Sequence, residues 1–116
     1  GRMTSHAAAD GGLPQARGLV FFGFPLHPAD DVGTKRAEHL PRVPQPLLFL
    51  QGTRDELAEL PLIQGTVGGL GPRARMHVVE DADHSFAVRK TRGHDPAGVI
   101  PGLAEATVAW ARELLR

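Results

Sequence analysis

An aspartate and a histidine each follow directly on an apolar segment of the chain. Asp55 ends the sequence LLFLQGTRD, and His84 lies in the sequence HVVEDADHSF. A carboxylate that accepts a hydrogen bond from one imidazole nitrogen fixes the tautomer of the ring, so that the other nitrogen can take a proton from a hydroxyl group. The ordered pair therefore predicts an orienting acid and a general base for nucleophilic catalysis.

Each of these residues also has a structural interpretation. Asp55 can cap a following helix, because aspartate side chains accept backbone N–H groups at helix starts. His84 can be a loop histidine that bonds to the backbone. Asp81 and Asp83 fit turn positions, where short aspartates bond their own backbone, and Asp83 is the alternative acid if Asp55 is a cap. His27 can line a pocket, but the prolines beside it favour a stiffened loop with a structural histidine.

The elements around these loops predict how the two residues are positioned. The apolar segment at 18–25 is typical of a strand buried on both faces of a parallel sheet, and a second and a third strand are expected at 47–51 and 75–79. Helices are expected over 2–10, 56–70 and 102–116, and the polar loop at 26–46 contains a helical turn near 35–40. Alternating strands and helices predict an α/β fold with a parallel sheet and flanking helices. Loops at the carboxyl ends of such strands converge, which brings Asp55 and His84 to one edge.

Composition limits the class of protein and its partners. The 116 residues fit one domain, and 13 basic and 13 acidic residues give no basic surplus for nucleic acid. No apolar run approaches the roughly 18–20 residues that span a bilayer, and no signal peptide is evident, so we expect a cytoplasmic protein without membrane contact. The absence of cysteine excludes disulfides and thiolate sites. Scattered histidines and the lack of a phosphate-binding loop predict neither metal nor cofactor.

The two loop sequences resemble the last two catalytic loops of α/β-hydrolases. The segments GLVFFGFPLHP and EHL are similar to the branch that contains dienelactone-hydrolase-like bacterial proteins and the testis-expressed and NSL-complex hydrolase-like proteins. The resemblance covers residues 1–116. It implies a serine hydrolase with Asp55 as the triad acid, His84 as the base, and an ester or related acyl compound as the small-molecule substrate.

The same resemblance implies that the nucleophile is not in this sequence. Residues 1–5, GRMTS, match the positions just after the serine of a G-x-S-x-G elbow, so the serine is expected upstream of Gly1. Residues 1–116 would then be the C-terminal part of a single α/β-hydrolase domain, inactive by themselves. The only serines are poor substitutes: Ser5 lacks flanking glycines, and Ser85 directly adjoins His84.

Two alternatives to a hydrolase fragment stay open. One is a non-catalytic hydrolase-like scaffold that binds other proteins, because a fold does not determine a function. The other is a self-sufficient small domain that starts at Met3. In a fragment, the first strand would lack a sheet neighbour, and its open apolar edge predicts self-association or a partner there.

Overall fold

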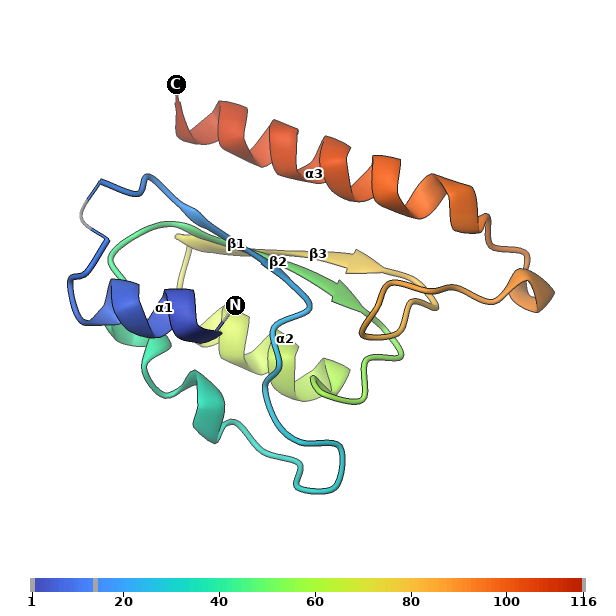
Figure 1. Cartoon of the computed structure of the whole chain (residues 1–116), viewed down its shortest axis with the longest axis horizontal. Coiled ribbons are helices and arrows are strands. Elements are labelled where there is room, and N and C mark those ends of the chain that lie inside the picture. Colours follow the sequence, from blue (N-terminus) through green and yellow to red (C-terminus); the bar gives the residue numbers. More distant parts are fainter. Residues whose placement is uncertain (1, 14, 116) are drawn as a thin grey trace.

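One parallel sheet lies between helices in this protein (Figure 1). The computed structural model describes residues 2–13 and 15–115. The sheet has three strands in the order β1-β2-β3, namely β1 (Leu19–Phe22), β2 (Leu47–Gly52) and β3 (Ala74–Val79). Helices α1 (Arg2–Ala9) and α2 (Leu60–Gly69) cover one face, and α3 (Val99–Leu114) covers the other. The predicted α/β fold with a parallel sheet and flanking helices is confirmed.

Strand β2 is the centre of the sheet and is buried along its whole length. Its odd-numbered residues Leu47 and Phe49 belong to the core beneath α1 and α2, which includes Phe21 of β1. Its even-numbered residues Leu48 and Leu50 pack in the core beneath α3. Successive side chains of a strand point to opposite faces, so a strand covered by helices on both faces is apolar throughout.

The long connection from β1 to β2 is irregular and carries two short 3-10 helices, Lys35–Ala37 and Leu40–Arg42. Both fall in or next to the segment where a helical turn was expected. Arg73 holds the 3-10 helix Leu40–Arg42 in place, because its guanidinium donates to the carbonyl oxygens of Val43 and Pro41. This arginine lies just before β3 and has a purely structural set of partners.

Helices α2 and α3 do not begin where the apolar spacing placed them. Helix α2 begins at Leu60, four residues after the expected start, and α3 begins at Val99, three residues before the expected start. Each has a proline in its first turn, Pro61 and Pro101, where the missing N–H has no partner within the helix. Apolar spacing alone does not show where a helix begins, because the residues of the preceding turn can continue the same spacing.

The exposed surface includes one edge of the sheet. Strand β1 pairs with β2 on one side, and Phe22 at its end is 59% exposed. Within residues 2–13 and 15–115, no helix has the length and apolar character needed to cross a membrane.

Candidate active site

The structure brings Asp55 and His84 into contact at the carboxyl edge of the sheet. Asp55 follows β2 and His84 follows β3, which are neighbouring parallel strands. The Nδ1 atom of His84 lies 2.9 Å from the Oδ2 atom of Asp55. The carboxylate has no exposed surface, whereas 38% of the imidazole is exposed. A buried acid therefore supports a histidine that is open to a reacting group.

This contact determines which nitrogen of His84 can accept a proton. An ionised carboxylate only accepts hydrogen bonds, so Nδ1 carries the hydrogen and donates it to Asp55. Among the described residues, no hydrogen bond involves the Nε2 atom of His84. The ring lies beside a surface depression of about 310 Å³. The depression is lined by Arg54, Glu56, Leu57, Asp83, His84 and Ser85. The free lone pair on Nε2 of His84 is the group that a general base needs.

Asp55 has a second, structural contact that orients its carboxylate. Its Oδ1 atom accepts the backbone N–H of Leu57 at 2.8 Å, a local bond of an aspartate with the backbone two residues ahead. The helix-cap interpretation of Asp55 is wrong, because the residue at the cap position of α2 is Glu59. The residues between Asp55 and α2 form a turn that holds the carboxylate toward His84.

Gly23 is a part of the site that the sequence patterns did not reveal. It follows β1 with a backbone φ of +73°, and a Cβ atom at this position would lie 3.2 Å from Nδ1 of His84. Its N–H donates to the carbonyl oxygen of Leu50 at 2.8 Å, which holds the backbone in this place. The available signal was a glycine directly after an apolar strand, but nothing local shows that the imidazole lies against it.

His27 lies at the same edge but has no free ring nitrogen. It is 2% exposed, its Nδ1 donates to the carbonyl oxygen of Pro28 at 2.8 Å, and its Nε2 accepts the N–H of Glu59 at 3.0 Å. Both nitrogens therefore bind backbone, which agrees with the structural interpretation of this residue. The contact connects the loop after β1 to the start of α2.

Neither serine of the chain is bonded to His84. The buried hydroxyl of Ser5 lies 2.6 Å from Nε2 of His39. Ser85 is exposed, and its backbone N–H donates to Oδ1 of Asp83 at 2.9 Å. Asp83 also accepts the N–H of Ala87 at 3.0 Å, so its carboxylate organises the turn that presents His84.

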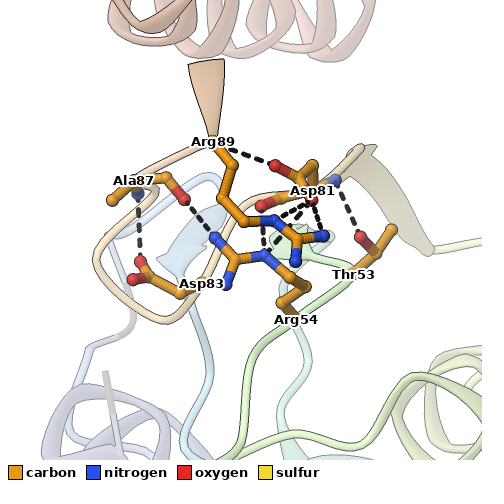
Figure 2. Close-up of polar contacts among 6 residues, drawn as sticks. All are labelled: Thr53, Arg54, Asp81, Asp83, Ala87 and Arg89. Carbon is orange, nitrogen blue, oxygen red and sulfur yellow. Dashed lines mark hydrogen bonds and ion pairs between the residues drawn. The ribbon is translucent and has the colours of Figure 1, made fainter. Parts of the chain in front are cut away.

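Asp81 lies in a turn, as expected, and its carboxylate also binds two arginines. Its carboxylate accepts the side chain and the backbone N–H of Arg89 and lies 3.3 Å from Nε of Arg54 (Figure 2). The hydrogen bond from Arg89 holds the pKa of Asp81 well below its usual range, although burial acts in the opposite direction. The same bond raises the pKa of Arg89. Asp81 is therefore an ionised acid that joins two arginines at the base of the histidine loop.

The histidines and acids of the described residues form no site of the kind that binds a metal ion. Within residues 2–13 and 15–115, no three or more histidine, aspartate or glutamate side chains are grouped so that they could hold a metal ion. Acid–base chemistry at His84 is what these side chains can perform.

Comparison with known families agrees with this geometry. The model of the alpha/beta hydrolase domain matches residues 1–112, which is nearly the whole chain. The three parallel strands with flanking helices are consistent with such a domain. The chain therefore belongs to the α/β-hydrolase family.

Proposed function

We propose that residues 1–116 supply the acid and the general base of a serine hydrolase that acts on an ester or related acyl substrate. The observation that carries the proposal is the 2.9 Å bond between the buried carboxylate of Asp55 and Nδ1 of His84. It leaves the opposite ring nitrogen without a hydrogen bond among the described residues, on a histidine that lines a surface depression. Membership of the α/β-hydrolase family supports the same assignment.

In the proposed reaction, Nε2 of His84 removes the proton of a serine hydroxyl as its oxygen attacks the acyl carbon. The proton then passes from Nε2 to the leaving oxygen as the ester bond breaks, and the acyl group stays on the serine. His84 next takes a proton from a water that attacks the acyl carbon, and this proton returns to the serine oxygen as the carboxylic acid leaves. Asp55 stabilises the positive charge on the ring during both steps. His84 therefore acts first as a base and then as an acid, while Asp55 stays ionised throughout.

The nucleophile is proposed to lie upstream of Gly1. Two observations support this: the hydroxyl of Ser5 is buried against His39, and Ser85 is a neighbour of His84 on one exposed turn. The likeness of residues 1–5 to the segment after a nucleophile elbow adds to them. The likeness of GLVFFGFPLHP and EHL to the dienelactone-hydrolase-like and NSL-complex branch is retained as part of the proposal.

The test uses a fluorophosphonate probe and a short-chain aryl ester on the protein at its natural length. We expect the wild type to be labelled on a serine outside residues 1–116 and to hydrolyse the ester. His84→Ala should abolish both reactions, whereas His77→Ala, at an exposed position of β3, should abolish neither. Labelling of Ser5 or Ser85 would overturn the upstream nucleophile. A protein that neither labels nor hydrolyses any acyl ester would favour the non-catalytic scaffold.

A further inference from the structure

The two ends of the loop that carries His84 are tied together by one carboxylate. Asp81 lies at the start of this loop and Arg89 at its end (Figure 2). Oδ2 of Asp81 accepts the backbone N–H of Arg89 at 2.7 Å, and Oδ1 accepts its Nε at 2.9 Å and its Nη2. The Asp81 side chain is only 5% exposed, so little water competes for these bonds. The loop is closed at its base.

Arg54 bonds this loop on both sides of His84. Its Nε donates to the carbonyl oxygen of Asp81 at 2.7 Å, before the histidine, and its Nη2 donates to that of Ala87 at 3.3 Å, after it. Its backbone N–H donates to the carbonyl oxygen of Ala82 at 2.8 Å. Arg54 is also the residue directly before Asp55. The acid and the base are therefore connected through one side chain as well as through their own hydrogen bond.

The loop has a conformation that depends on such contacts. Asp81 and Phe86 have φ values of 66° and 63°, in the left-handed region that residues with a side chain rarely adopt. Backbone of this kind persists only where the surrounding bonds hold it. Three residues supply these bonds. Arg54 donates to the carbonyl oxygen of Asp81, and the hydroxyl of Thr53 accepts the N–H of Asp81. Inside the turn, the carboxylate of Asp83 accepts the N–H of Ala87.

We propose that Arg54 is a positioning residue that sets the place of the His84 imidazole relative to the carboxylate of Asp55. The role rests on the proposed function, since positioning matters for catalysis only if His84 is the base. Among the described residues, the Arg54 side chain has no hydrogen bond to the ring of His84 or to the carboxylate of Asp55, and it acts through the carbonyl oxygens on both sides of the histidine. A misplacement of about 1 Å in an active site can lower turnover by about a hundredfold.

The chemistry of the contact requires an arginine. A guanidinium offers several N–H groups in a fixed plane, so Nε and Nη2 can reach two separate carbonyl oxygens. A lysine keeps the positive charge near Asp81, but its compact ammonium group cannot donate to two separate carbonyl oxygens in the way that the guanidinium does. Arg54→Lys therefore removes the double contact with the loop and leaves the charge in place.

The experiment compares Arg54→Lys with Arg73→Lys in the protein at its natural length. Arg73 also donates its guanidinium to backbone carbonyl oxygens, but those of Pro41 and Val43, outside the histidine loop. Both variants should lose thermal stability to a similar degree. We expect Arg54→Lys to lower kcat for an aryl ester by about 10- to 100-fold with little change in KM, and Arg73→Lys to change kcat less than twofold.

A second measurement does not depend on turnover. The proton on Nδ1 of His84 should give a downfield resonance, identified by its loss in His84→Ala, and this resonance should weaken or shift in Arg54→Lys but not in Arg73→Lys. An unchanged resonance together with a kcat equal to that of Arg73→Lys would overturn the positioning role. An inactive wild type whose resonance still responds to Arg54→Lys would instead refute the proposed function while keeping the link between Arg54 and the pair.

If Arg54→Lys fails to fold, Arg54→Gln is the second variant, because the glutamine amide can still donate to one of the two carbonyl oxygens that Arg54 binds. We expect a fall in kcat of about tenfold and a shifted resonance of the His84 proton. Unchanged kcat and an unchanged resonance in that variant would overturn the proposal.

Discussion

Asp55 uses its two carboxylate oxygens for different purposes. One oxygen accepts from His84 and the other accepts the N–H of Leu57, so the side chain cannot rotate without losing a bond. One carboxylate therefore has both a backbone partner and a histidine partner. The local turn orients the acid, and the acid orients the histidine.

Asp55→Asn should separate these two purposes. The amide oxygen can keep the bond to Leu57, but the amide nitrogen then faces Nδ1 of His84 and favours the tautomer with the hydrogen on Nε2. We expect the variant to fold and its kcat/KM for an aryl ester to fall by about 10³- to 10⁴-fold. Circular dichroism and steady-state kinetics test this, and turnover at the wild-type rate would place the triad acid elsewhere.

Gly23 allows a second test at the scale of one residue. Gly23→Ala must hold a side chain at a φ of +73°, which costs about 1–2 kcal/mol, and its Cβ must displace the imidazole that lies 3.2 Å away. We expect lower stability and a loss of turnover of about tenfold or more.

The matched control for Gly23 is Gly11→Ala. Gly11 has a similar φ of +81°, but no atom lies within 4 Å of the place of a Cβ. This variant should lose a comparable amount of stability and keep its turnover. Equal turnover in the two variants would show that Gly23 acts only through its backbone.

At the scale of elements, the end of β2 and the start of the histidine loop are in backbone contact. A Cβ on Gly52 would overlap the carbonyl oxygen of Ala82, while the backbone N–H groups of Thr53 and Arg54 bond to Val79 and Ala82. The absence of a side chain at Gly52 is therefore what lets the acid loop and the base loop lie together.

Gly52→Ala should separate the two loops and destabilise the fold. We expect a loss of about 2 kcal/mol or more in the free energy of unfolding, because the clash is with backbone, which cannot move aside as a flexible side chain can. Gly65→Ala is the control, since this position in α2 has no atom near a Cβ and alanine favours the helix by about 0.5–1 kcal/mol. Urea unfolding measures both, and a stable Gly52→Ala variant would contradict the close approach.

At the scale of the whole molecule, the ionisation of Asp81 links stability to pH. Its pKa is lower in the folded chain than the value of about 3.9 for a free aspartate, so the unfolded chain binds more protons at low pH. The stabilisation from Asp81 is complete above about pH 5 and is lost as the pH falls below about 4 toward the lower folded pKa.

Asp81→Asn should remove this part of the acid sensitivity. We expect the wild type to lose more unfolding free energy than the variant between pH 5 and pH 2.5, as measured by urea unfolding at several pH values. The variant should start from a lower stability at pH 7, because the arginines lose an ionised partner. Parallel decline of the two proteins would show that Asp81 does not contribute to acid unfolding.

The strand pattern and the order of the chemical residues could be predicted from the sequence. Buried parallel strands are apolar on both faces, so the segments around Phe21 and Phe49 were recognisable without a structure. Strand β3 was also predicted at its place, but it has no fully buried residue and exposes Arg75, His77 and Val78. Residues directly after such strands must lie at one edge of the sheet, and this is why Asp55 and His84 could be paired. Helix starts were less predictable, because the residues of the preceding turn can continue the apolar spacing of the helix.

The contacts that make the pair into a site depended on the tertiary structure. Gly23 against His84, Arg54 across the histidine loop, and Asp81 between two arginines each join residues that are distant in the sequence or bonded through backbone carbonyls. The register of the parallel strands decides which of these groups meet, and no local pattern of residue types records that register. The sequence alone predicted a parallel sheet with Asp55 and His84 at one edge. Only the packing of the three loops after its strands decided how these two side chains face each other.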